Sequence, residues 1–177
     1  RCAPNKRIED ILSAFAVFNK TVNPLSRFIH VGTFSGAEHY RNMLNGLASE
    51  LGISNHTHFA GSVSQDELSA YYSLSDVFLC MSRHEGFCIP LIEAMAHDLP
   101  VIAYSAGAIP ETLDTSGIIF KNINFIEIAE MMGRITTDDQ FRSAVVKAQQ
   151  ERLKHFRDRN LAEELKTHLR PLCKSLR

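Results

Sequence analysis

Short apolar runs alternate with longer segments of helical period along most of this chain. The runs are rich in Val, Ile and Phe, and this alternation is typical of a parallel β-sheet that is covered by helices. We therefore predict an α/β fold, a Rossmann-like parallel sheet flanked by helices. Its strands are expected at residues 27–33, 57–61, 76–81, 100–104 and 117–120.

Apolar and capping residues also define the helices between these strands. The first helix is predicted at residues 7–20, and one of its faces carries Ile8, Ile11, Leu12, Phe15 and Phe18. A second helix is predicted at 37–52, where Gly52 suits the position just after a helix end. A third opens at Ser64, with Glu67 at the spacing of a capping box.

The two ends of the chain depart from this alternation. Residues 124–135 and 138–169 read as helices without a strand between them, so we expect them to pack outside the sheet or against something absent from the chain. The chain also opens into a loop and helix without a first strand. Either it is a fragment cut inside a larger protein, or another segment completes the sheet. We predict one domain, 1–177, with a core at 1–135 and C-terminal helices at 136–177.

Composition and charge narrow the class of protein. The apolar content of 45% and the charged content of 22% are near the average for soluble globular domains. The formal net charge of −1, without a long basic run, argues against a nucleic-acid partner, so any bound anion must be held locally. No membrane span or signal peptide is evident. We expect a cytoplasmic protein, at the inner face of the membrane if it is peripheral.

The four cysteines point to reduced thiols. They form no C-x-x-C pair, and a chain of 177 residues can bury a core without disulfides. Cys80 lies within the apolar run D-V-F-L-C-M and is expected to be a small buried hydrophobe.

Two acidic residues stand out in the otherwise apolar stretch R-H-E-G-F-C-I-P-L-I-E-A-M-A, residues 83–96. If Glu85 and Glu93 shared one helix, they would lie about 12 Å apart along its axis, which is too far for a pair of catalytic carboxylates. Pro90 favours a helix that begins near Cys88 or Ile89. Glu85 then lies on the loop before the helix, and Glu93 lies about one turn inside it.

The amides at this helix start are the candidate anion ligands. Unpaired donors are expected at Gly86, Phe87, Cys88 and Ile89, and Gly86 is expected to give the loop its conformational freedom. A helix start after a strand of a parallel sheet can hold a phosphate. Glu93 would repel a phosphate, so it is better placed to accept hydrogen bonds from a ribose diol, and Glu85 could bind a second polyol such as a sugar.

Ordinary structural roles remain open for each of these residues. Glu85 could be a solvated loop acid, Glu93 a helix-start acid stabilised by the helix dipole, and Lys6 a plain surface charge. His56 and His58 have no third ligand nearby, so a zinc site is not expected. The chain contains neither a G-x-G-x-x-G fingerprint nor a P-loop motif.

The same stretch carries a resemblance to a known family. The sequence E-G-F-C-I-P-L-I-E, followed by A-M-A-H-D-L-P-V-I-A and G-A-I-P-E-T-L, resembles the E-x7-E signature of retaining glycosyltransferases of the GT-B fold, the large family-4 group. Further pieces agree in order: V-G at 31–32, F-A-G-S-V-S-Q-D-E-L at 59–68 and A-Y-Y-S-L-S-D-V-F-L at 70–79. The resemblance covers about residues 1–135. It implies the C-terminal, donor-binding half of such an enzyme, cut just after its first strand.

The resemblance also implies roles for individual residues. Arg1 and Lys6 would neutralise the diphosphate leaving group, together with the amides of Phe87, Cys88 and Ile89, and no metal or other cofactor would be needed. Glu93 would bind the ribose and Glu85 the donor sugar. The remaining contacts would be the backbone at Ser62 and Val63 with the base, and a close approach at Gly32. The family often has glycine where Cys88 stands, so a side chain there is expected to narrow the approach to the sugar.

These observations predict a function with one alternative. We expect the donor-binding half of a retaining glycosyltransferase, which moves a sugar from a GDP- or UDP-sugar to a hydroxyl acceptor in cell-surface polysaccharide or glycolipid assembly. A mannose-type donor is the first guess, and an N-terminal acceptor domain would be the partner. The alternative is a nucleotide-sugar-binding or regulatory module without turnover.

Overall fold

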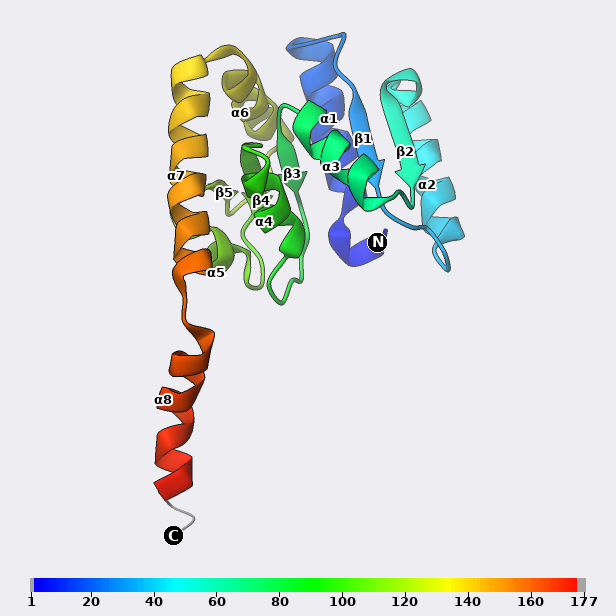
Figure 1. Cartoon of the computed structure of the whole chain (residues 1–177). Coiled ribbons are helices and arrows are strands. Elements are labelled where there is room, and N and C mark those ends of the chain that lie inside the picture. Colours follow the sequence, from blue (N-terminus) through cyan, green and yellow to red (C-terminus); the bar gives the residue numbers. More distant parts are fainter. Residues whose placement is uncertain (1, 175–177) are drawn as a thin grey trace.

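The structure, a computed structural model, describes residues 2–174, and their side chains up to residue 171. Five short strands alternate with helices in the first two thirds of the chain, and helices alone form the last third (Figure 1). The strands are β1 (Phe28–Val31), β2 (Thr57–Gly61), β3 (Phe78–Cys80), β4 (Val101–Tyr104) and β5 (Ile118–Phe120). The helices are α1 (Ile8–Thr21), α2 (Glu38–Glu50), α3 (Gln65–Leu74), α4 (Ile89–Ala96), α5 (Ile109–Leu113), α6 (Phe125–Thr137), α7 (Asp139–Asp158) and α8 (Leu161–Lys174), with short 3-10 turns η1 (Pro4–Lys6) and η2 (Ser54–His56).

All strand pairs are parallel, but they form two sheets and not one. β1 pairs with β2, while β3, β4 and β5 form a second sheet in that order. The α/β class with helix-flanked parallel strands is confirmed, and each of the five predicted strands is present. Within the described residues no strand hydrogen bonds join β1 to β3, so the sheet is divided at this point.

The N-terminal segment links the two sheets at their carboxyl ends. The Cys2 amide donates to the carbonyl of Thr33, two residues after β1, at 2.9 Å. The Arg83 amide, which follows β3, donates to the carbonyl of Asn5 at 2.9 Å. Residues 2–6 therefore connect the carboxyl end of β1 to the carboxyl end of β3. They also place Lys6 at the carboxyl edge of the strands.

Helix boundaries follow the local sequence signals. The capping box at the start of α3 is present, since Ser64 and Glu67 exchange side-chain and backbone hydrogen bonds. Gly52 follows α2 with a positive φ of 69°, as expected for a residue that ends a helix. The helix predicted to open at Ser64 and the helix start predicted near residue 89 are both found.

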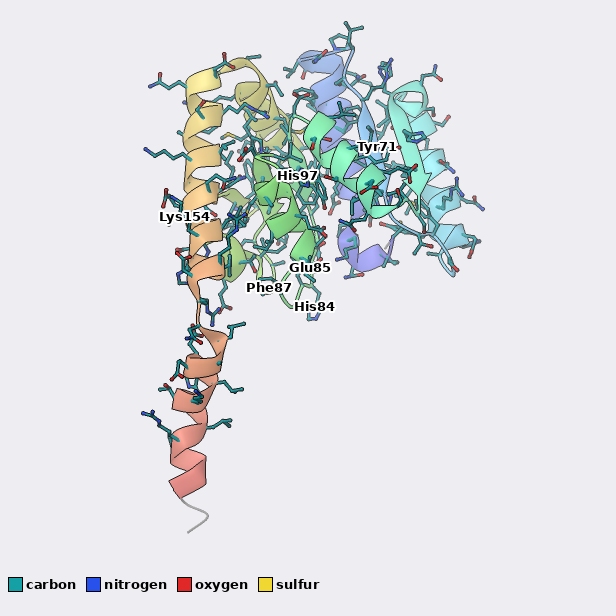
Figure 2. The ribbon with its side chains drawn as sticks, in the orientation of Figure 1. Tyr71, His84, Glu85, Phe87, His97 and Lys154 are labelled. Carbon is teal, nitrogen blue, oxygen red and sulfur yellow. The ribbon has the colours of Figure 1, made fainter. Side chains whose placement is uncertain are left out.

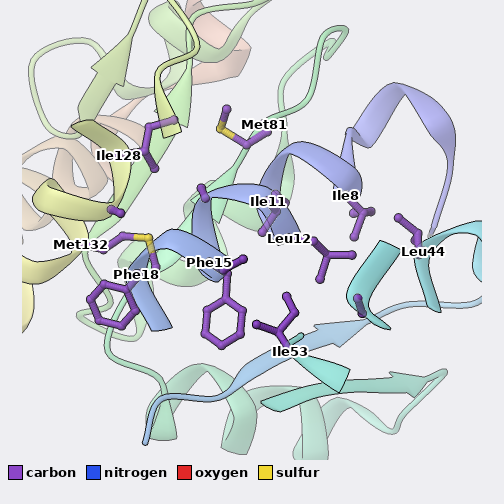
Figure 3. Packing of buried hydrophobic residues seen from close by; sticks show 14 of the residues in the cluster. Ile8, Ile11, Leu12, Phe15, Phe18, Leu44, Ile53, Met81, Ile128 and Met132 are labelled. Carbon is purple, nitrogen blue, oxygen red and sulfur yellow. The ribbon is translucent and has the colours of Figure 1, made fainter. Parts of the chain in front are cut away.

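Two clusters of buried side chains form the core. The larger cluster surrounds α1, which packs against α6 and α2, and Figure 3 shows its side chains meeting those of the neighbouring helices and strands. Its fully buried members include Leu12, Leu44, Ile53, Ile128 and Ile135. The smaller cluster lies between α4, α5 and the β3–β5 sheet and includes Leu91, Met95, Val101, Ile109 and Leu113. This second cluster fixes the position of α4.

The C-terminal helices differ from the single helix expected over 138–169. Arg159 takes an extended conformation, and the Asn160 side chain accepts a hydrogen bond from the Glu163 amide, so a new helix begins at Leu161. α7 is fixed to β4 because Gln149 bonds the backbone of both Leu99 and Val101 at 2.9 Å. α8 instead extends away from the body of the molecule (Figure 1). Within residues 2–174, no helix is long and apolar enough to cross a membrane.

Candidate functional site

The start of α4 has no side-chain cap. Cys88 occupies the N-cap position with a left-handed backbone, φ 64° and ψ 65°, and its side chain makes no capping hydrogen bond. Pro90 lies in the first turn, as the sequence predicted. Among the described residues, none accepts a hydrogen bond from the amides of Gly86, Phe87, Cys88 or Ile89. These donors, at the positive end of the helix dipole, are therefore available to an anion.

The special backbone conformation lies at Cys88 and not at Gly86. Gly86 has no positive φ, and a side chain added there would meet no atom within 4 Å. The expectation that Gly86 provides the unusual conformation is wrong, because the left-handed residue is the one directly before the helix. A left-handed residue also explains why a glycine would suit the Cys88 position.

The Cys88 side chain faces the interior. It is 6% exposed, and its Sγ lies 3.9 Å from Sγ of Cys80 at the end of β3. The contact with Cys88 lowers the pKa of the Cys80 thiol to about 7, while the same contact and burial raise the pKa of Cys88. Cys2, Cys80 and Cys88 are free thiols, and the side chain of Cys173 lies outside the described residues. The prediction that Cys88 narrows the approach to the site is wrong, because its thiol packs inward and leaves only its amide at the helix start.

Glu85 and Lys6 form an ion pair at the loop before α4. Lys6 Nζ lies 2.5 Å from Glu85 Oε1, and the two side chains are 29% and 9% exposed. Because Lys6 lies in η1 and is 79 positions away along the chain, only the fold brings these charges together. Figure 2 shows Glu85 beside His84 and Phe87 at the N-terminal end of α4. Arg1, the second cation predicted here, lies outside the described residues.

Residues 107–112, which follow β4, support the loop at 85–88. The Ala108 amide donates to the Glu85 carbonyl at 3.0 Å, and Gly107 lies so close that an added Cβ would be 2.5 Å from the same oxygen. Thr112 Oγ1 donates to the Phe87 carbonyl at 2.7 Å. Arg152 of α7 in turn donates to the Thr112 carbonyl at 3.0 Å. The backbone carbonyls of the loop at 85–88 are therefore held by the Ala108 amide and the Thr112 hydroxyl.

Glu93 lies one turn inside α4 and already has a partner. The hydroxyl of Tyr72, on α3, donates to Glu93 Oε2 at 3.0 Å. Sequence reasoning missed Tyr72, Gly107, Thr112 and Arg152 as parts of the site. Gly107 and Thr112 were visible only within the family-like segment G-A-I-P-E-T-L, and nothing in the sequence pairs Tyr72 with Glu93.

The other predicted contacts lie at the carboxyl ends of β1 and β2. Gly32 follows β1, with φ 150°, and its amide donates to the Gly61 carbonyl at 2.8 Å. Ser62 is exposed and Val63 half-buried, directly before α3. Within the described residues, no hydrogen bond joins them to the loop at 85–88. They share that loop's edge of the fold because every strand pair is parallel and the N-terminal segment links the two sheets.

Metal-ligating side chains do not cluster in the described part of the chain. His58 is exposed, and Nδ1 of His56 lies 2.7 Å from the guanidinium of Arg27. The arrangement at α4 combines free amides, one paired lysine and two carboxylates. Chemically, such a set can hold a phosphate between groups that accept hydrogen bonds from hydroxyls.

Comparison with known proteins decides the family. The family model described as "Glycosyl transferases group 1" matches residues 1–152, which is most of the chain. The chain belongs to this family. The resemblance seen in the E-x7-E segment is thereby confirmed.

Relatives of this group 1 glycosyl transferase include bacterial enzymes. A GDP-mannose-dependent alpha-(1-6)-phosphatidylinositol monomannoside mannosyltransferase of Mycobacterium tuberculosis is 29% identical over 147 residues, which are 78% of this chain and 37% of that protein. An N-acetyl-alpha-D-glucosaminyl L-malate synthase of Bacillus anthracis is 30% identical over 164 residues, 82% of this chain and 41% of that protein. The chain therefore spans less than half the length of these curated relatives.

Solved structures share the fold of this group 1 chain. HepE of Anabaena, solved in complex with UDP and glucose, matches with a TM-score of 0.80 at 23% identity, over 94% of this chain and 46% of HepE. The C-terminal domain of a group 1 glycosyl transferase (LpcC) from Francisella tularensis matches with a TM-score of 0.74 at 24% identity, over 88% of this chain and 81% of that domain. The fold is that of a GT-B C-terminal domain.

Proposed function

We propose that this chain is the donor-binding half of a retaining glycosyltransferase, which moves a sugar from a nucleoside-diphosphate sugar to a hydroxyl acceptor. The observation that carries the proposal is the uncapped start of α4. Its free amides lie between Glu85 on one side and Glu93 on the other, at the carboxyl edge of the parallel strands. A nucleoside-diphosphate sugar has its groups in the same order, with a diphosphate between two polyols, the ribose and the sugar.

The diphosphate is proposed to lie against the amides of residues 86–89, with Lys6 beside them. Lys6 has three N–H donors, and the contact with Glu85 uses one of them. Its remaining donors can therefore reach a phosphate without breaking the ion pair. As the sugar leaves, negative charge grows on the diphosphate, so Lys6 and the amides stabilise the transition state more than the bound donor. Arg1 is proposed to add a second cation.

The two glutamates are assigned different ligands. Glu93, inside α4, is proposed to accept hydrogen bonds from the ribose hydroxyls, and Glu85 from the hydroxyl edge of the donor sugar. Glu85 is paired with Lys6, which reduces the repulsion between its carboxylate and an approaching phosphate. Since Lys6 and the amides supply positive charge at the diphosphate, the proposed reaction uses no metal and no other cofactor.

The base and the sugar are proposed from the position of neighbouring loops and from the ligands of related proteins. Ser62 and Val63 are proposed to meet the base, and Gly32 to allow a close approach of the donor. The mycobacterial relative is named as dependent on GDP-mannose, and HepE was solved with UDP. We therefore propose a GDP- or UDP-sugar donor, with mannose as the first sugar to test. The proposed process is polysaccharide or glycolipid assembly. It would take place in the cytoplasm, or at the inner face of the membrane if the whole protein is peripheral.

The rest of the protein is proposed to supply the acceptor domain, and α8 is proposed to contact it. Leu161, Leu165 and Leu169 are 65%, 59% and 44% exposed on one face of α8. This helix extends away from the body (Figure 1). In the whole protein, changing the three leucines to Glu should destabilise the assembly, whereas Thr167→Glu on the opposite face should not. Equal melting temperatures for both variants would contradict this contact.

A further strand of the whole protein is proposed to lie between β1 and β3. Each of these strands has only one hydrogen-bonded neighbour among the described residues, and residues 2–5 already connect their carboxyl ends. A strand there would join the two sheets and satisfy both edges. Hydrogen exchange would then be slow along Phe28–Val31 and Phe78–Cys80 in the whole protein. Fast exchange at both edges would exclude the strand.

The decisive experiment is calorimetric titration of the whole protein with UDP, GDP and ADP, then with their sugar conjugates. The proposal predicts that one nucleoside diphosphate binds clearly more tightly than its monophosphate, and that one sugar conjugate is turned over when an acceptor is added. The anomeric configuration of the product, measured by NMR, should match that of the donor. Binding without turnover would instead favour a nucleotide-sugar-binding module, and the absence of any binding would contradict both.

A further inference from the structure

Tyr72 joins the two helices that follow β2 and β3. Its hydroxyl donates to Glu93 Oε2 at 3.0 Å, so a side chain of α3 holds a side chain of α4. The same helix α3 begins directly after Ser62 and Val63. The contact therefore connects the proposed base-binding loop to the proposed ribose-binding acid.

The phenol ring is itself held firmly. It stacks on the ring of His97, at the end of α4, with a centroid distance of 5.4 Å and an interplanar angle of 17°. The His97 ring nitrogens lie 3.1 Å from Ser73 Oγ and 3.4 Å from Ser69 Oγ, both on α3. Phe78 of β3 also packs against Tyr72, with a ring centroid distance of 6.0 Å and an interplanar angle of 49°. Ring packing and hydrogen bonds thus leave the Tyr72 hydroxyl little freedom.

The direction of the hydrogen bond follows from charge. Burial, followed by the nearby charge of Glu93, raises the pKa of Tyr72, so the phenol keeps its proton. An ionised carboxylate can only accept hydrogen bonds. Tyr72 is therefore the donor, and it occupies one position on Oε2. The other oxygen, Oε1, has no hydrogen-bond partner among the described residues.

We propose that Tyr72 is a positioning residue, which fixes the Glu93 carboxylate so that its free oxygen meets the ribose hydroxyls of the nucleotide. This inference rests on the proposed donor site. A long acidic side chain that is already held in one conformation loses less conformational freedom when the ligand binds. The benefit should appear only for ligands whose ribose carries hydroxyls, so Tyr72 would set the preference of the site for ribonucleotides.

A purely structural role makes a different prediction. If Tyr72 only packs α3 against α4, then its ring matters and its hydroxyl does not. Tyr72→Phe keeps the ring contacts with His97 and Phe78 and removes only the hydroxyl. Tyr71→Phe is the matched control, because Tyr71 is the neighbouring residue on the same helix (Figure 2). Within the described residues, the Tyr71 hydroxyl makes no hydrogen bond.

The test is a binding comparison in the whole protein with two probes of the same base, the ribonucleoside diphosphate and the 2′,3′-dideoxynucleoside diphosphate. Tyr72→Phe should weaken ribonucleotide binding about five-fold and leave dideoxynucleotide binding unchanged, as expected for one lost hydrogen bond. Tyr71→Phe should change neither. In a Glu93→Gln background, Tyr72→Phe should have no further effect, because the carboxylate that it positions is gone.

The possible outcomes separate this inference from the proposed function. If the parent discriminates between the two probes and Glu93→Gln abolishes this preference but Tyr72→Phe does not, the role of Tyr72 is overturned while the site stands. If Tyr72→Phe weakens both probes equally, it acts on the fold and the inference is again overturned. A parent protein without any preference for the ribonucleotide overturns both Tyr72 and the assignment of Glu93.

Discussion

The starts of α3 and α4 show two ways to treat the same structural problem. Each helix follows a parallel strand and begins at the same edge of the fold, and each leaves backbone amides without helical partners. At α3, Ser64 and Glu67 form a complete capping box, in which the Ser64 and Glu67 amides each donate to the other residue's side chain. At α4, Cys88 turns its side chain inward and the amides remain free. The start of α3 is capped by its own side chains, whereas the start of α4 leaves its amides open to a ligand.

Contacts from outside α4 stabilise its uncapped start. Cys88 has a left-handed backbone, which is unfavourable for a residue with a side chain. Gly107, Ala108 and Thr112 support the preceding loop through its backbone, and Lys6 balances the charge of Glu85. The start of α4 is therefore held in place by its neighbours and not by a side-chain cap.

The largest expected effect is from Gly107→Ala. A methyl group there would lie 2.5 Å from the Glu85 carbonyl oxygen, and φ of 52° adds strain. We expect a loss of about 2–4 kcal/mol in the free energy of unfolding, measured by denaturant titration. Gly36→Ala is the control, because Gly36 also has a positive φ but an added Cβ meets no atom within 4 Å. It should cost about 1 kcal/mol, and equal losses would show that the loop contact does not matter.

Removing the charged groups beside α4 should give the next largest effect. Glu93→Ala and Lys6→Ala should each weaken nucleoside-diphosphate binding by about 1–3 kcal/mol, because each removes a charge-assisted hydrogen bond. Calorimetry on the whole protein measures this loss. Lys154→Ala is the control, since Lys154 pairs with Glu151 on the solvent-exposed face of α7, where the two side chains are 60% and 62% exposed (Figure 2). Parent-like affinity in both site variants would refute the site assignment.

The smallest effect tests the capped helix. Ser64→Ala removes the side chain that caps α3 and should lower the free energy of unfolding by about 1 kcal/mol. Nucleotide affinity should stay unchanged, because the Ser64 hydroxyl satisfies the helix and not the ligand. Thermal unfolding and calorimetry on the same sample give the two values. A loss of affinity with no loss of stability would reverse the contrast between the two helices.

The sequence predicted those features that depend on neighbouring residues. Apolar periodicity gave the strands and α1, the spacing of Ser64 and Glu67 gave a capping box, and Pro90 gave the start of α4. Each of these signals depends on residues that are close together in the sequence. It can therefore be read without knowledge of the tertiary contacts.

Contacts between distant segments were not predictable in this way. The Lys6–Glu85 pair spans 79 positions and the Tyr72–Glu93 bond spans 21, and neither has a local signature. The inward thiol of Cys88 depends on Cys80 across a loop, and the division into two sheets depends on which edges of β1 and β3 find partners. Tertiary packing decided these features, and with them the geometry of the site.

The most direct test of the account is an amide NMR titration of the whole protein with its best nucleoside diphosphate, compared with the nucleoside alone. The account predicts that the diphosphate shifts the amide signals of Gly86, Phe87, Cys88 and Ile89 most strongly, while the capped amide of Glu67 stays in place. Unchanged signals at residues 86–89 on saturation, with the largest shifts elsewhere, would contradict the claim that the open start of α4 holds the diphosphate.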